Sequence, residues 1–191
     1  GCVQLNDLLD LLSAYGDCGV EESAWQCGDP LEYQGYDYET VQIGEQCWFA
    51  ENLRSENYRN GNPIPLGLSN QDWSSVSHGA ASVYTNYGLL YNWYAVDDVR
   101  GLCPSGWDVP SYSAINDLTS YLGGETVAGG EMKSTSDWAQ SGNGSNSSGL
   151  NVFPAGFRDY GNGNSLFANY KSFLWTRSSS GNEGWYLYLG S

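Results

Sequence analysis

The sequence offers few side chains that could do covalent or acid–base chemistry. It has five cysteines and one histidine in 191 residues. The cysteines form no Cys-x-x-Cys pair, and a single histidine does not complete a zinc site. We therefore expect the cysteines to form disulfide bonds in an oxidising compartment.

Two disulfides are predicted from the positions of the cysteines. Cys2 and Cys18 flank a leucine-rich segment, and Gly16 lets the chain fold back so that they can meet. Cys27 and Cys47 lie on either side of a predicted hairpin, where a bond would close the entry to the main domain. These two pairs leave one cysteine over.

The lone histidine is not expected to act as a catalytic base. His78 lies in the polar stretch Ser-Val-Ser-His-Gly, with no nucleophile signature beside it. A histidine base works with a positioned nucleophile or a second orienting group. We interpret His78 as a surface residue.

Three residues near the C-terminal end are the best candidates for a metal site. Asp159, Asn162 and Asn164 offer side-chain oxygens at nearly alternate spacing, and oxygen is the ligand that calcium prefers. One carboxylate is little charge for a divalent cation, so a solvated turn is the favoured interpretation. No cofactor is expected, with calcium as the alternative. The Asp97-Asp98 pair is also interpreted as structural, because such a pair caps the end of a helix more often than it holds a metal.

Aromatic residues are the strongest indication of a binding surface. The chain has 15 tyrosines, 8 tryptophans and 5 phenylalanines, many of them in its last third. Such rings stack on sugar faces and also dominate protein-binding loops, because they bring large contact area at low entropic cost. Most of the aromatic residues in the C-terminal cluster should lie in the core, with two or three exposed; the cluster consists of Tyr160, Phe167, Tyr170, Trp175, Trp185, Tyr186 and Tyr188. The predicted ligand-binding residues are Tyr160, Asn162, Asn164, Tyr170 and Trp185.

The charge of the chain excludes some classes of partner. The formal net charge is −15, whereas nucleic acids and anionic membranes need clustered cations. No apolar run reaches the roughly 18 residues that a transmembrane span needs. The first residues lack the basic and apolar regions of a signal peptide, so we expect any secretory signal to lie upstream or to have been removed.

The first elements are predicted to be a helix and a linker. In residues 2–18 one apolar stripe is formed by Leu5, Leu8, Leu9, Leu12 and Tyr15. Gly16 then stops the helix. The stretch is similar to half of a dockerin repeat but lacks its calcium loop, and the alternative is a helix that docks on an upstream segment. We divide the chain into an appendage (1–19), a linker (20–26) and a main domain (27–191).

The main domain is predicted to begin with a hairpin. Residues 36–43 alternate in polarity, and Gly44-Glu45 turns the chain into residues 46–50. A long surface excursion over 55–82 follows. Residues 83–97 predict a strand or turn leading into a helix, one face of which would carry Leu90, Trp93, Tyr94 and Asp97.

Residues 101–110 combine one cysteine, two prolines, two glycines and one tryptophan. We predict that this stretch is a turn that serves as the structural hinge of the domain. It places Cys103 in the turn and Trp107 in the core, and Pro110 with Ser111 starts a helix over 111–122. The predicted buried stripe of that helix is Ile115, Leu118, Tyr121 and Leu122. A polar loop at 141–149 is then followed by predicted strands at 150–158, 172–178 and 184–189, in a mostly antiparallel sheet.

Seven motifs in order resemble a known family, the Fibrobacter succinogenes major paralogous domain, over roughly residues 27 to 189. The motifs are Val41-Gln-Ile-Gly-Glu-Gln-Cys-Trp-Phe-Ala-Glu-Asn-Leu53, Tyr87-Gly-Leu-Leu-Tyr-Asn-Trp-Tyr-Ala95, Cys103-Pro-Ser-Gly-Trp-Asp-Val-Pro110, Leu122-Gly-Gly124, Met132-Lys-Ser-Thr135, Phe153-Pro-Ala-Gly-Phe-Arg158 and Phe173-Leu-Trp-Thr-Arg-Ser178.

This resemblance implies an α+β, C-type lectin-like fold with short, mostly antiparallel strands and two helices, preceded by the small N-terminal helix. It also implies a bacterial protein that is extracellular or displayed on the cell surface. Family domains continue to a closing strand with a cysteine near its end, whereas this chain stops at Ser191. The resemblance therefore implies a truncated domain in which Cys103 is unpaired.

The expected function is non-catalytic binding of an extracellular glycan or protein through aromatic and Asn/Ser-rich loops, as in adhesion. A structural spacer without a ligand is the alternative. The family that the chain resembles is related to the formylglycine-generating enzymes. Those enzymes use a second active-site cysteine late in the chain. No cysteine follows Cys103 here, so no enzymatic activity is expected.

Overall fold

The protein has a mixed α+β architecture built from short elements. The computed structural model describes residues 2–4, 25–181 and 183–191. The predicted N-terminal helix falls largely outside this range, as does Cys18. Within the range, the predicted α+β class is confirmed.

A four-stranded antiparallel sheet holds the N-terminal half together. Its strands are β1 (Val3–Gln4), β4 (Thr40–Ile43), β5 (Gln46–Phe49) and β8 (Trp107–Asp108), in the order β4-β5-β1-β8. The predicted hairpin is confirmed, because β4 and β5 pair from Thr40↔Phe49 to Ile43↔Gln46. The predicted helical stripe, which begins at Leu5, lies outside the described residues, and the residues just before it form β1, which pairs with both β5 and β8. Residues 2–4 are thus part of the domain's sheet rather than of an appendage.

Four two-stranded antiparallel ribbons complete the described strands. They are β2 (Leu31–Tyr33) with β3 (Tyr36–Tyr38), β6 (Ala81–Val83) with β7 (Leu89–Tyr91), β9 (Phe157–Arg158) with β10 (Ser165–Leu166), and β11 (Lys171–Ser180) with β12 (Glu183–Gly190). The strand predicted over 150–158 is therefore only two residues long. Its earlier part is irregular, with isolated bridges from Val152 to Lys133 and from Gly156 to Ser172.

The described helices are short, and the first three begin at polar side-chain caps. They are α1 (Asn70–Ser75), α2 (Trp93–Val96), α3 (Tyr112–Tyr121) and α4 (Glu125–Met132). Ser111 caps α3 as predicted, because its hydroxyl accepts from the Ala114 backbone N–H at 3.1 Å. None of the helices in this part of the chain is long and apolar enough to cross a membrane.

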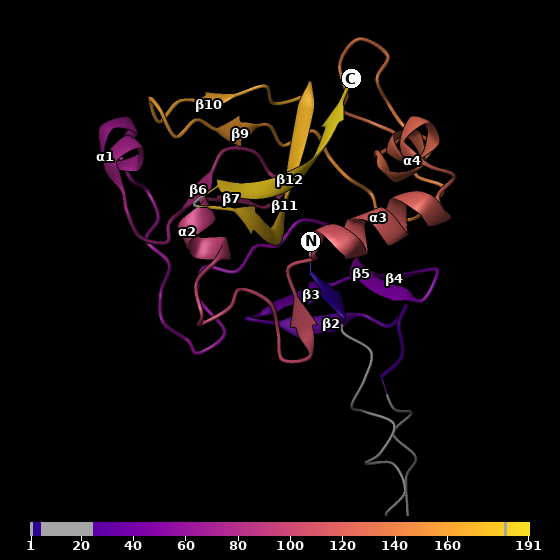
Figure 1. Ribbon diagram of the computed structural model, residues 1–191, viewed down its shortest axis with the longest axis horizontal. Helices are drawn as coiled ribbons and strands as arrows, with labels where there is room; N and C mark the ends of the chain where they lie inside the picture. Colours follow the sequence, from indigo (N-terminus) through magenta and orange to yellow (C-terminus); the bar gives the residue numbers. More distant parts are fainter. Residues whose placement is uncertain (1, 5–24, 182) are drawn as a thin grey trace, which may run out of the picture.

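The β11–β12 ribbon occupies the middle of the molecule. In Figure 1 it lies between α3 and α4 on one side and α1 and α2 on the other, with the β9–β10 hairpin above and the β2–β5 strands below. One face of the ribbon closes a core against the helices, in a cluster that includes Ile115, Leu118, Met132 and Leu189. A second core cluster lies on the four-stranded sheet, where Tyr38 stacks on Phe49 at 4.5 Å and Phe49 contacts Trp107 at 4.7 Å between ring centroids.

The disulfides correct one prediction and confirm another. Cys27 pairs with Cys47 as predicted. The predicted Cys2–Cys18 bond and the predicted unpaired Cys103 are both wrong, because Cys2 pairs with Cys103 across 101 positions of sequence. The physical reason is the β1 pairing, which carries Cys2 to the turn before β8 and buries both cysteines. Cys103 therefore gives no support to a truncated domain.

Two other predictions change in the structure, and the predicted polar loop gains a defined attachment. The helical period predicts Tyr121 in the buried stripe of α3, but its side chain is 68% exposed and its ring lies over the Gly44 turn at the surface. Residues 89–91 form strand β7, so the helix predicted in this segment is limited to the four residues of α2. Tyr94, which is expected on the buried face of that helix, is exposed. The polar loop 141–149 is tied to the end of α4 through backbone bonds such as Gly144 N–H to the Ser134 carbonyl at 2.9 Å.

Candidate ligand-binding site

A cleft of about 400 Å³ lies between β7, β9 and the central ribbon. Its lining comes from distant parts of the sequence, with Leu53 and Tyr91 on one side and Phe157, Phe173 and Trp175 on the other. Ligand pockets in proteins commonly have volumes of roughly 300–1,000 Å³ and mostly apolar walls. This cleft has the size and the lining of such a pocket.

Alternation along the ribbon builds one wall of the cleft. Successive strand residues face opposite sides, so Lys171, Phe173 and Trp175 of β11 share one face. Phe173 lies opposite Tyr188 of β12, and Trp175 lies opposite Tyr186. The rings of these pairs lie 5.3 Å and 6.0 Å apart between centroids, within the range of favourable aromatic pairs.

The β9–β10 hairpin extends this wall with two more rings. Phe157 contacts Phe173 at 5.0 Å and Phe167 at 5.9 Å between ring centroids. We call this continuous set of rings the aromatic ladder, and its members are Phe157, Phe167, Phe173, Trp175, Tyr186 and Tyr188.

The aromatic ladder has an open side. Tyr186 is 53% exposed, Tyr188 is 50% exposed and Phe167 is 46% exposed. The opposite face of the ribbon is closed, because Leu187 and Leu189 pack into the helix core. Half-exposed rings beside a cleft are where a ligand can gain apolar contact without unfolding the core.

The floor of the cleft is fixed by two hydrogen bonds in series. The Trp175 indole N–H donates to the Tyr91 carbonyl at 2.8 Å, and the Tyr91 hydroxyl donates to the Ser55 carbonyl at 2.8 Å. Burial raises the pKa of the Tyr91 phenol well above its usual range, which keeps it a donor. The Trp175 ring is therefore held in place before a ligand arrives.

Arg158 braces the other side of the cleft. Its guanidinium donates to the Gly163 carbonyl at 2.9 Å and the Leu68 carbonyl at 2.8 Å, and it lies over the Trp73 ring at 4.5 Å. Burial lowers the pKa of Arg158. Since its N–H groups are engaged by backbone carbonyls, Arg158 joins β9 to the segment around α1.

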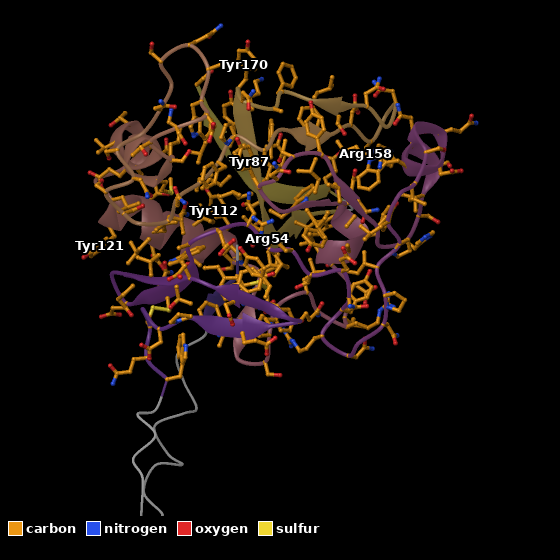
Figure 2. The ribbon with its side chains drawn as sticks, turned by 180° about the vertical axis from the view of Figure 1, so that it is seen from behind. Arg54, Tyr87, Tyr112, Tyr121, Arg158 and Tyr170 are labelled. Atoms are coloured by element: carbon orange, nitrogen blue, oxygen red, sulfur yellow. A yellow bond between two sulfur atoms is a disulfide. The ribbon has the colours of Figure 1, made fainter. Side chains whose placement is uncertain are left out.

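A second, more polar hollow of about 260 Å³ shares Asn52 and Tyr87 with the cleft. Asn52 donates to the Tyr87 carbonyl at 2.8 Å, and the Tyr87 ring stacks on Phe153 at 4.6 Å between centroids. Burial and then the negative charge of Asp137 raise the pKa of the Tyr87 phenol. Figure 2 shows Tyr87 near the middle of this view, between Tyr112 and Arg158.

The five predicted ligand-binding residues do not converge on one site. Tyr160 lines the cleft and is 66% exposed. Tyr170 precedes β11, and Figure 2 shows it at the upper edge of the molecule, away from Arg158. Trp185 lies on the helix side of the ribbon, where its ring contacts Tyr112 at 5.0 Å.

Asn162 and Asn164 belong to the turn between β9 and β10. The Asn162 amide donates to an Asp159 carboxylate oxygen at 3.0 Å, and its own oxygen accepts from the Asn164 backbone N–H at 2.9 Å. The Asn164 oxygen accepts from the Asn70 amide at 2.7 Å. The oxygens considered for calcium thus already accept hydrogen bonds within the protein.

The candidate catalytic groups lie elsewhere. Cys103 is buried in its disulfide, and the His78 side chain is exposed. Asp98 holds Arg100 through bonds of 2.8 Å and 2.6 Å, which lower the pKa of its carboxyl group. Within the described residues, no group of three or more His, Cys, Asp or Glu side chains is placed to hold a metal ion.

Sequence reasoning missed most of the aromatic ladder. Phe173, Trp175, Tyr186 and Tyr188 fall in predicted strands, but the sequence alone did not bring them onto a common face. The signal was present in the period-two pattern Lys171-Ser-Phe-Leu-Trp175, where large rings alternate with Ser172 and Leu174. What the pattern lacked was the pairing register, which comes from the structure.

Comparison with known proteins identifies a family for the chain. The sequence model of the Fibrobacter succinogenes major domain matches residues 41–190, which is most of the chain and contains the aromatic ladder and, except for Cys2, the residues that line the cleft. No curated protein and no solved structure matches the chain.

Proposed function

Because the chain belongs to the Fibrobacter succinogenes major domain family, we propose that it is a non-catalytic binding module of a bacterial protein, with its ligand in the cleft beside the aromatic ladder. The cleft is the observation that carries this proposal. It combines a volume of about 400 Å³ with an aromatic wall, of which the Tyr186 ring is about half exposed. Large aromatic surfaces that are already ordered lose little entropy on binding.

The lining of the cleft supports binding rather than catalysis. Its walls are mostly apolar, and the polar groups of Trp175 and Arg158 are engaged by backbone carbonyls. A catalytic pocket needs a nucleophile or a general base within reach of the substrate. The candidate nucleophile, Cys103, is held in a buried disulfide.

A location outside the cytoplasm, in a secreted or cell-surface protein, is part of the same proposal. Two disulfides are typical of proteins that fold in an oxidising compartment. Adhesion to an extracellular glycan or protein is the role that such a module would serve. The C-type lectin-like fold also belongs to this proposal, supported by the small antiparallel sheets and the disulfide that fastens the N-terminal strand.

A binding screen with matched variants tests the proposal. The wild-type protein, Tyr186→Ala and Tyr121→Ala are applied to glycan and extracellular-protein arrays, with and without EDTA. Both substitutions remove an exposed tyrosine, but only Tyr186 lines the cleft. We expect specific binding that is lost in Tyr186→Ala, kept in Tyr121→Ala and indifferent to EDTA. Equal binding by all three proteins would contradict the cleft, and no binding to either array would favour a structural spacer.

A further inference from the structure

We propose, resting on the proposed function, that the ligand is a carbohydrate chain bearing isolated carboxylates, and that Lys171 binds one of these carboxylates at the open end of the aromatic ladder. Lys171 begins β11 on the same face as Phe173 and Trp175. The cleft and Lys171 are therefore two ends of one continuous surface.

Lys171 differs from every other cation of the chain. The sequence has 7 lysines and arginines, all within the described residues. Three of the others form ion pairs, namely Arg54, Arg100 and Arg177. The remaining three donate to backbone carbonyls, namely Arg59, Lys133 and Arg158. Within the described structure, Lys171 has neither a carboxylate partner nor a hydrogen-bond acceptor for its ammonium group.

Aromatic rings hold the Lys171 ammonium in place. Its Nζ lies 4.3 Å from the centroid of Phe167 and 5.5 Å from that of Tyr188, within cation–π range. The ring faces attract the charge but accept no strong hydrogen bond. The N–H groups of Lys171 are therefore positioned and still available to an acceptor on a ligand.

The shape of the aromatic ladder favours a chain of rings as the ligand. Neighbouring ring centroids of the ladder lie between 5.0 Å (Phe157–Phe173) and 6.0 Å (Trp175–Tyr186) apart. Sugar rings stack on aromatic faces through their C–H surfaces, so a row of half-exposed rings suits a ligand that repeats the same apolar face. A folded protein ligand would instead concentrate its contacts on a few fully buried hot-spot side chains.

The charge balance favours sparse carboxylates over a dense polyanion. Binding a densely charged chain takes a cluster of cations, and this face offers one uncommitted ammonium on a protein of net charge −15. One ammonium matches one carboxylate among neutral sugar rings. The inferred ligand is therefore a mostly neutral glycan with occasional uronic acids.

A matched pair of oligosaccharides tests this inference. Xylohexaose and the same chain with one glucuronic acid branch are titrated against the wild-type protein by calorimetry. We expect the acidic oligosaccharide to bind about three- to tenfold more tightly, the range of one exposed charge-assisted contact. Lys171→Gln should remove this difference while changing neutral binding less than twofold, and Lys171→Arg should restore part of it. Arg177→Gln, which alters an exposed arginine that pairs with Asp108, should keep the difference.

The outcomes separate this inference from the proposed function. Equal affinity for the two oligosaccharides, or an unchanged preference in Lys171→Gln, would overturn the role of Lys171. If neither oligosaccharide binds while an array protein binds in a Tyr186-dependent way, the carbohydrate assignment is overturned and the binding function stands. If Tyr186→Ala binds the oligosaccharides as well as wild type does, the cleft itself is wrong.

Discussion

Gly79 occupies a position where any larger residue would collide with the core. A Cβ at this position would overlap the Tyr58 hydroxyl oxygen and lie 3.1 Å from the Ala95 Cα. Tyr58 is among the most buried side chains of the protein. The fit between Gly79 and Tyr58 helps to fix the segment that leads into β6.

Gly79→Ala is predicted to destabilise the protein by about 1–3 kcal/mol, because overpacking forces backbone or side chains to move. Gly130→Ala is the matched control. Gly130 lies in α4, where an added Cβ would meet no atom within 4 Å, so alanine should stabilise the helix by about 0.5–1 kcal/mol. Denaturant unfolding measures both changes. If both substitutions changed the free energy of unfolding by the same amount, the contact with Tyr58 would not be what restricts the residue at position 79.

The buried Tyr91 phenol should make stability fall at alkaline pH. Burial raises its pKa above the value of the unfolded chain, so above about pH 10 the unfolded state loses the proton first. The stability contribution is therefore complete below pH 10 and is lost as the pH rises toward the folded-state pKa.

Tyr91→Phe tests this pH dependence. At pH 7 the variant should lose about 1 kcal/mol of unfolding free energy, because the hydrogen bond to the Ser55 carbonyl is absent. Between pH 10 and 11 its stability should decline less steeply than that of wild type. Urea unfolding curves at each pH give both quantities. If the stability of the variant and that of wild type fell equally between pH 10 and 11, Tyr91 would be excluded as the source of the pH dependence.

At the scale of elements, β1 depends on the Cys2–Cys103 disulfide. The strand has two residues and lies between β5 and β8, so pairing alone provides few hydrogen bonds. The disulfide closes a loop across 101 positions of sequence and restricts the unfolded chain accordingly. It also anchors the strand at a fully buried cysteine.

Removal of this disulfide should cost more stability than removal of the other one. We predict a loss of about 4–5 kcal/mol for the Cys2→Ala/Cys103→Ala double variant. The Cys27→Ala/Cys47→Ala double variant opens a bond that spans 20 positions, and it should lose about 3 kcal/mol. Guanidinium unfolding under non-reducing conditions compares the two. A larger loss for the Cys27–Cys47 pair would contradict the loop-closure argument.

Elements with local signals could be predicted from the sequence. The β4–β5 hairpin follows from alternation around Gly44-Glu45, and α3 follows from the Ser111 cap and the Ile115 and Leu118 spacing. Strand β1 could not be predicted, because its apolar neighbours gave a helical period and its partners lie more than 40 positions away. Helix α4 was missed because Gly129 and Gly130 lower the helix propensity of its sequence.

At the scale of the whole molecule, the cleft is made by chain segments that are far apart in sequence. Leu53, Tyr91, Phe157 and Trp175 meet because the central ribbon lies between the helices and the β9–β10 hairpin. Composition predicted that aromatic residues would carry binding, but it could not say which rings share a face. The predicted set therefore includes Tyr160 of the cleft and also Trp185, which lies on the opposite face of the ribbon.

The central claim is that the ligand occupies the cleft beside the aromatic ladder. Amide hydrogen exchange of the protein, with and without a saturating ligand from the arrays, tests it most directly. The account predicts slower exchange at residues 87–91, 155–160 and 172–175, which line the cleft. Protection confined to α3 and α4, with unchanged exchange in these three segments, would contradict it.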